Sequence, residues 1–136
     1  MAAGYAERAT AAGRALAIGP VEIIEVEGRK AGRVAEAEAI LARAADATLV
    51  ACDEHGEALT SRAFAGRLAG WRDHGVRRLA FAIGGADGLD PAVTERAAFK
   101  LAFGPQTWPH ALARLMLAEQ IYRAASILAG APYHRD

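Results

Sequence analysis

The chain has 136 residues, with 16 basic and 16 acidic side chains and therefore no net formal charge at pH 7. This length suits one domain (1–136), and the charge balance excludes a disordered polyelectrolyte or a strongly basic nucleic-acid-binding arm. No apolar run reaches the roughly 18 residues of a membrane helix, and the single Cys52 excludes an internal disulfide and suits a reducing compartment, so we expect a cytoplasmic protein without a membrane partner.

The first third of the chain alternates between helical and extended patterns. Residues 2–17 are rich in alanine and predict a helix that ends near Gly19-Pro20, because proline has no amide donor. The β-branched segment VEIIEV (21–26) predicts a short strand. Residues 33–46 predict a helix, because they are rich in alanine and place glutamates early and arginine late, an order that the helix dipole favours.

The rest of the chain continues this alternation. Its patterns predict strands at 48–52, 78–84 and 100–103, a polar turn at 53–56, and helices at 60–74, from 91 and at 109–129. Asp90-Pro91 is typical of a helix start, since aspartate caps the helix and proline suits its first position. Because the strands are apolar on both faces, we expect an open α/β fold with a parallel sheet covered by helices on both faces.

Three of the expected strands end in unusual residues. In open α/β sheets, ligands gather outside the carboxyl ends of the strands. One strand ends at Cys52-Asp53, another enters the glycine-rich loop 84–88, and a third enters the loop GPQTWPH (104–110). Glycines let the backbone approach a ligand closely, although a tight turn from strand to helix explains them as well. The loop 104–110 would offer backbone groups to an adenine edge, and Trp108 would either line an apolar pocket or, more commonly, belong to the core.

The last predicted helix has an apolar stripe wider than one sheet face requires, which favours a second copy of the chain as partner. On this helix, Glu119 and Arg123 are one turn apart and predict a surface ion pair of small value. The tail Tyr133-His134-Arg135 gathers a phenol, an imidazole and a guanidinium, at a place where chains are usually functionally silent.

Other polar residues give weaker signals. The five arginines at 62, 67, 72, 77 and 78 form a local basic bias that could contact phosphates. No spacing of His, Cys and Asp predicts a metal site, so we expect none. Cys52 has no Cys-x-x-Cys partner and is interpreted as a small buried residue rather than a nucleophile.

Three segments together resemble one known family: LVACDEHGEALTSRAFA (49–65), AFAIGGADGL (80–89) and TWPHALARLMLAEQIYRAASILAGAPYHRD (107–136). They are similar to the RlmH family of SPOUT-class methyltransferases, over nearly the whole chain and most strongly from about residue 48. The resemblance implies a homodimer whose parallel sheet ends in a C-terminal trefoil knot. It also implies methyl transfer from S-adenosylmethionine to N3 of pseudouridine 1915 in 23S ribosomal RNA, on the assembled ribosome. Family members usually begin with a further strand, about twenty residues upstream of this start, so we expect this chain to lack it.

The resemblance assigns site residues by motif. The cofactor contacts fall on Cys52, Gly84, Phe103, Gly104, Pro105, Gln106, Thr107 and Trp108. The family commonly has leucine at the position of Cys52 and serine at that of Gly104, so side-chain contacts there are not carried over.

The catalytic candidates are Arg123, Tyr133, His134 and Arg135. His134 would act as base or proton relay, the two arginines would hold phosphate or ring charge, and Tyr133 would orient the base. Two other functions stay open. One is a catalytically impaired paralogue that dimerises or binds RNA. The other is a receiver-type regulatory module with Asp53 as phospho-acceptor.

Overall fold

The computed structural model describes residues 1–26, 32–85 and 88–136, which form two compact units. The helical unit comprises Met1–Ile23, Leu59–Gly75 and Arg114–Asp136, and the sheet unit comprises Ile24–Ala58 and Val76–Ala113. The chain crosses between the units repeatedly, and a single domain over 1–136 stays a prediction. Across the described ranges, no helix is long and apolar enough to cross a membrane.

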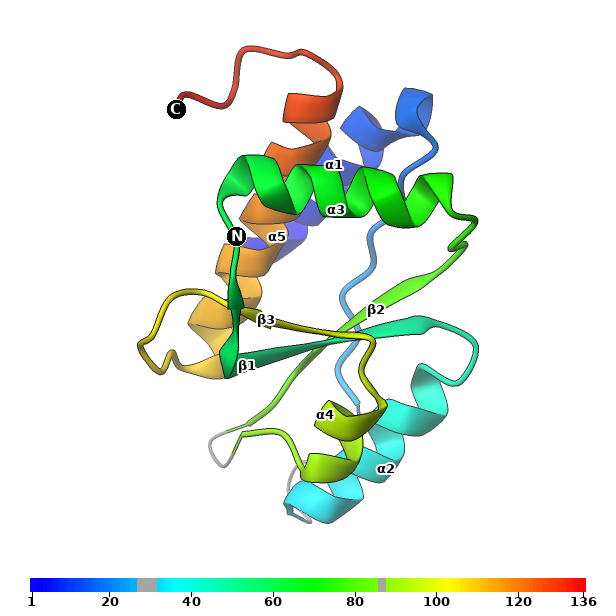
Figure 1. The fold of residues 1–136 in the computed structure, drawn as a ribbon, viewed down its shortest axis with the longest axis vertical. Helices are drawn as coiled ribbons and strands as arrows, with labels where there is room; N and C mark the ends of the chain where they lie inside the picture. Colours follow the sequence, from blue (N-terminus) through cyan, green and yellow to red (C-terminus); the bar gives the residue numbers. More distant parts are fainter. Residues whose placement is uncertain (27–31, 86–87) are drawn as a thin grey trace. The chain divides into compact units, whose positions relative to one another are not determined.

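Among the described residues, the sheet unit contains a three-stranded sheet. Its elements are α2 (Arg33–Arg43), β1 (Thr48–Ala58), β2 (Leu79–Ile83), α4 (Pro91–Arg96) and β3 (Phe99–Ala102). The strand order is β2-β1-β3, and both pairs are parallel, which confirms the α/β fold with a parallel sheet (Figure 1). The covering of both sheet faces and the knot stay predictions.

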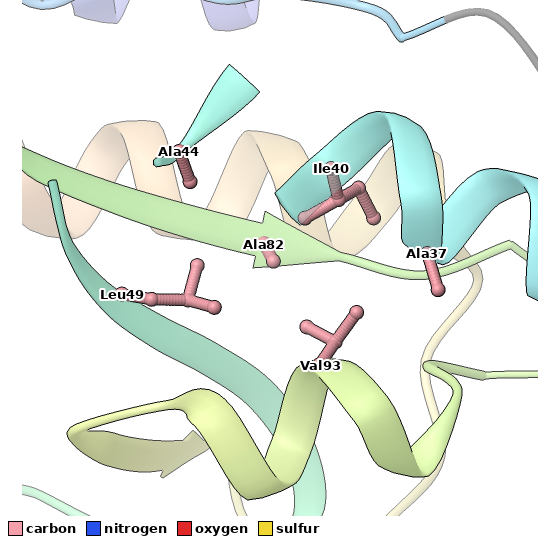
Figure 2. Close-up of a cluster of buried hydrophobic side chains, with 6 residues drawn as sticks. All are labelled: Ala37, Ile40, Ala44, Leu49, Ala82 and Val93. Atoms are coloured by element: carbon pink, nitrogen blue, oxygen red, sulfur yellow. The ribbon is translucent and has the colours of Figure 1, made fainter. Parts of the chain in front are cut away.

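The core of the sheet unit lies where α2 and α4 meet the sheet (Figure 2). Leu49 of β1 and Val93 of α4 are almost completely buried, among small side chains from α2 and β2. Burying a leucine or valine side chain contributes about 1.5–3 kcal/mol. The predicted cap of α4 is confirmed, since Asp90 Oδ1 accepts from the Ala92 amide at 3.0 Å. These contacts hold β1 and β2 in place just before the strand ends that matter for function.

The helical unit contains α1 (Ala2–Gly13), the 3₁₀ turn η1 (Arg14–Leu16), α3 (Ser61–Asp73) and most of α5 (His110–Leu128). Thr60 caps α3, because its Oγ1 accepts from the Ala63 amide at 3.0 Å. Ser61 at the start of α3 donates to Gln120 Oε1 of α5 at 2.7 Å. Tyr5 of α1 and Tyr122 of α5 lie with ring centroids 6.2 Å apart. The start of α3 and one face of α5 are therefore fixed to each other.

The strand predicted at 21–26 is wrong. These residues belong to no strand, and the Val21 amide donates instead to the side chain of Thr10 at 2.9 Å. Ile23 and Ile24 remain about 40% exposed. Preference for a strand depends on packing against a neighbouring strand, and the described sheet pairs only β2, β1 and β3.

The polar turn predicted at 53–56 does not end its strand, because β1 continues to Ala58. Cys52 and Glu57 both align with Leu101 of β3, so the residues between them form an irregularity within the strand. The turn chemistry that suggested an end is nevertheless present, since Asp53 Oδ1 accepts from the His55 amide at 3.2 Å.

Candidate functional site

The register of the sheet brings three predicted cofactor segments together. Cys52 of β1 pairs with Ile83 of β2 on one side and with Leu101 of β3 on the other. Gly84 directly follows Ile83, and Phe103 follows the last residue of β3. The three segments therefore lie side by side at the carboxyl edge of the sheet, where open α/β folds bind their ligands. We call this the strand-end site.

The backbone of the strand-end site is packed too closely at Gly84 for any side chain. A Cβ atom there would lie 2.6 Å from the carbonyl carbon of Gly88, closer than real Cβ atoms approach. Gly85 and Gly88 also form an antiparallel bridge. Residues 86 and 87 of the predicted glycine loop lie outside the described residues. The loop thus presents backbone without side chains at Gly84 and Gly85.

Glu36 of α2 lies beside this loop, and sequence reasoning missed it. Glu36 is only 5% exposed. Its Oε1 accepts a long hydrogen bond from the Gly85 amide, at 3.4 Å. Alternation within an alanine-rich helix does not distinguish a buried glutamate from a solvated one, so no sequence signal could have found it.

The loop that follows β3 is held by one hydrogen bond within the loop and by another to β1. Trp108 Nε1 donates to the Phe103 carbonyl at 3.1 Å, and the Thr107 hydroxyl donates to the Glu54 carboxylate of β1. Gly104 has a φ of +94°, a conformation that favours glycine over serine. Pro105 and Gln106 are exposed. The interpretation of Trp108 as core is wrong, since the residue is 36% exposed.

Cys52 contributes no reactive thiol to the strand-end site. Burial raises the pKa of Cys52 to about 12, because the apolar surroundings penalise the thiolate. The side chain therefore stays a neutral thiol at physiological pH, which agrees with the interpretation of Cys52 as a small packing residue. As a neutral thiol, Cys52 offers a ligand only weak hydrogen bonding from its side chain, so its stronger polar groups are those of the backbone.

Three of the four catalytic candidates meet in the helical unit, around Glu119 of α5. Arg123 donates to Glu119 Oε1 from Nε at 2.9 Å and from Nη2 at 2.6 Å. Tyr133 donates its hydroxyl to the same oxygen at 3.1 Å, and its ring lies under the Arg123 guanidinium. Gln120 donates to the second oxygen of Glu119 at 2.8 Å. Glu119 is thus the acceptor that organises the cluster, rather than half of a simple surface pair.

His134 lies between a cation and an anion. Its Nδ1 is 3.1 Å from Arg123 Nη1, and its Nε2 is 3.0 Å from Asp136 Oδ1. Arg62 of α3 donates from Nε to the same Asp136 oxygen at 2.6 Å. We call Arg62, Glu119, Arg123, Tyr133, His134 and Asp136 the tail cluster.

The tail cluster changes the acidity of two of its members. Burial, followed by the hydrogen bond to Glu119, raises the pKa of Tyr133 to about 12, so its phenol stays protonated and can donate but not act as a base. The hydrogen bond from Arg62 holds the pKa of Asp136 below its ordinary value, so that carboxylate stays ionised at neutral pH. Arg62 and Asp136 were not among the predicted site residues.

Arg135 differs from its neighbours in the tail. Its side chain is exposed, and within the described part of the chain no hydrogen bond or ion pair engages it. It is therefore available to bind an anion from solution.

Three of the five arginines in the basic bias around α3 pair with carboxylates, and Arg67 lies over an aromatic ring. The partners are Asp136 for Arg62, the Trp71 ring for Arg67, Asp73 for Arg72 and Asp46 for Arg78. Among the residues that the structure describes, no group of three or more His, Cys, Asp and Glu side chains could hold a metal ion.

Comparison with known proteins finds one matching family and several similar proteins. The family described as "Predicted SPOUT methyltransferase" matches residues 1–134. The chain is 69% identical to the ribosomal RNA large subunit methyltransferase H of Phenylobacterium zucineum, over 97% of this chain and 86% of the relative. It is 65% identical to the protein of that name from Caulobacter vibrioides, over 100% and 88%. The identity is 55% with the one from Roseobacter denitrificans, over 97% and 86%.

Proposed function

Because the chain belongs to the RlmH family of SPOUT methyltransferases, we propose that it methylates ribosomal RNA with S-adenosylmethionine as methyl donor. The proposed target is N3 of the pseudouridine at position 1915 of the 23S RNA in the assembled ribosome. The observation that carries the proposal is the alignment of Cys52 with Ile83 and Leu101, because it gathers the three cofactor segments at one sheet edge.

The residues of the strand-end site fit an adenosyl ligand. Gly84 and Gly85 bear no side chain, so the backbone there can come close to a ligand, although the Gly88 backbone fills the Cβ direction at Gly84 and the Gly85 amide faces Glu36. The loop after β3 supplies further backbone groups, together with the exposed aromatic ring of Trp108. When bound, S-adenosylmethionine supplies a methyl group on a positively charged sulfur, which needs little further activation. The contacts of this chain would therefore mainly hold and orient the methyl donor.

The tail cluster suits the other requirement of the reaction, which is removal of the N3 proton. His134 would accept that proton, which leaves the nitrogen lone pair available for methylation. Arg123 carries a fixed positive charge beside His134 and would stabilise the negative charge that develops on the ring. Tyr133 would orient the base through its hydroxyl or ring, and the exposed Arg135 would bind phosphate.

The apolar surface of α5 supports a homodimer. Leu112 is 39% exposed, and Leu115, Met116 and Leu128 are only partly buried. A second copy of the chain would cover such a surface. We propose that dimerisation accompanies formation of the C-terminal trefoil knot. Within this proposal, the receiver-type interpretation of Asp53 has no supporting observation.

The test combines binding and transfer. Calorimetric titration of S-adenosylmethionine into the protein should show saturable binding. Ribosomes that lack the modification should then accept radiolabelled methyl groups, whereas free 23S RNA should accept far fewer. Cofactor binding without transfer to ribosomes or RNA would contradict the proposal and favour the catalytically impaired paralogue. Transfer to a different nucleotide would retain the enzyme and overturn its target.

A further inference from the structure

The two ring nitrogens of His134 have different partners, and only one protonation pattern satisfies both. Nδ1 faces Arg123 Nη1 at 3.1 Å, and Nε2 faces Asp136 Oδ1 at 3.0 Å. A guanidinium group only donates hydrogen bonds, and an ionised carboxylate only accepts them. Nδ1 must therefore be the acceptor and Nε2 must carry the proton. A proton on Nδ1 would place two donors against each other at Arg123.

This pattern leaves His134 in the form that a general base requires. The unprotonated nitrogen is Nδ1. Its lone pair accepts a hydrogen bond from Arg123, which also pairs with Glu119. The imidazole is well packed, because its side chain is only 12% exposed. For Nδ1 to take the substrate proton, Arg123 would have to release it, and the tautomer of His134 would then need no change.

Asp136 is itself held in place from a second helix. Arg62 of α3 donates to the same carboxylate oxygen that faces His134. One carboxylate oxygen has two lone pairs and can accept both bonds. The carboxylate and Arg62 are largely exposed, at 68% and 57%, so their ion pair contributes little to overall stability. The contact is thus better suited to orienting His134 than to holding the fold together.

We propose that Asp136, anchored by Arg62, is a positioning residue that accepts the Nε2 proton of His134 and, together with the donation from Arg123 to Nδ1, fixes the ring in the tautomer whose Nδ1 can take the substrate proton once Arg123 releases it. This inference rests on the proposed function for its catalytic meaning. Its structural part, the orientation and tautomer of His134, can be tested independently of any methyl transfer.

The direct test is a two-bond ¹H–¹⁵N NMR spectrum of the intact, ¹⁵N-labelled protein at a pH where His134 is neutral. We expect the wild type to show His134 protonated on Nε2 alone. In Asp136→Ala and Arg62→Ala, the Nε2 proton loses its acceptor or the anchor of that acceptor, so the shifts of Nε2 and its proton should move as for a lost hydrogen bond, while Arg123 still disfavours a proton on Nδ1. Asp136→Glu should restore the wild-type pattern. A proton on Nδ1 in the wild type, or an unchanged spectrum in Asp136→Ala, would overturn the proposal.

Kinetics supplies the second readout. Asp136→Ala should lower kcat for ribosome methylation about tenfold, while the Kd for S-adenosylmethionine stays unchanged and Asp136→Glu recovers most of the rate. Asp73→Ala is the matched control, because Asp73 is similarly exposed and pairs with Arg72 of α3. This control should change neither the spectrum nor kcat.

The outcomes separate this inference from the proposed function. An inactive wild type with the expected spectra would overturn the proposed function and support the orientation of His134. An active wild type whose His134 signals are the same in Asp136→Ala would overturn the inference alone. A changed spectrum with unchanged kcat in Asp136→Ala would show that the contact does not serve catalysis, which also overturns the positioning role.

Discussion

The strand-end site and the tail cluster are built from different parts of the polypeptide. At the strand-end site, position is set by sheet register and by backbone packing at Gly84, with few charged groups involved. In the tail cluster, position is set by two ion pairs, Arg62–Asp136 and Arg123–Glu119, which His134 joins through its two ring nitrogens. The first should therefore respond to added volume, and the second to lost charge.

The largest effect is expected from adding volume at the strand-end site. In Gly84→Ala, the new methyl group would lie 2.6 Å from the Gly88 backbone, so the loop must move. A displacement costing about 3 kcal/mol corresponds to a loss of about 100-fold in affinity for S-adenosylmethionine, measured by calorimetry.

Gly66→Ala in α3 is the control for Gly84→Ala. Gly66 has nothing within 4 Å of the added Cβ, and alanine in a helix interior stabilises by about 0.5–1 kcal/mol relative to glycine. Thermal unfolding should show this small gain, and cofactor affinity should not change. Equal affinity losses in both variants would contradict the backbone origin of the strand-end site.

Removing one charge from the tail cluster should give the next largest effect. Glu119→Gln keeps the shape and a carbonyl acceptor but leaves Arg123 without its anionic partner. We expect kcat for ribosome methylation to fall by about 10- to 100-fold with an unchanged Kd for S-adenosylmethionine. Glu95→Gln, at an exposed position of α4, should have no effect on either quantity. A matching loss of cofactor affinity in Glu119→Gln would contradict the division of labour between the two regions.

A smaller change should appear in the alkaline titration of the tyrosines, followed by phenolate absorbance. Tyr133 should ionise with a pKa of about 12, above its ordinary 10, because burial and the bond to Glu119 disfavour the phenolate. The neutral phenol is thus the stabilised form. The stability that the neutral Tyr133 phenol gives to the folded state is complete below pH 10 and is lost as the pH rises through about 12.

Two variants identify this titration step. Tyr133→Phe should remove it, and Glu119→Gln should move it toward the ordinary value, because the negative charge beside the phenol is gone. If the step stays near 12 in Glu119→Gln, burial alone accounts for it. The role of Glu119 as the electrostatic centre of the tail cluster would then be wrong.

The smallest effect is expected at Cys52. Since burial raises the pKa of Cys52 to about 12, a thiol reagent at pH 8 should react slowly with the folded protein and rapidly in guanidinium chloride. Cys52→Ala should change the Kd for S-adenosylmethionine by less than about twofold, because the proposed contacts at this position come from the backbone, which alanine retains. Rapid labelling of the native protein, with loss of cofactor binding, would contradict this account.

Local sequence patterns determined most helix boundaries and the parallel class of the sheet. Asp90-Pro91 predicted the start of α4 because caps depend on a few neighbouring residues. The apolar segments of β1, β2 and β3 predicted strands because short, nearly continuous apolar runs are typical of strands in parallel sheets. The resemblance to a known family added the candidate residues at the strand ends and in the tail.

Only the tertiary structure decided what those candidates contact. The segment 21–26 has strand composition but no strand partner, and the turn chemistry at Asp53 lies inside β1 because β3 continues to pair beyond it. Arg62 and Asp136 are 74 positions apart in sequence, yet their ion pair places a carboxylate on His134. Such contacts depend on where whole helices end in space. Local residue preferences carry no information about the distance between two residues that are far apart in sequence.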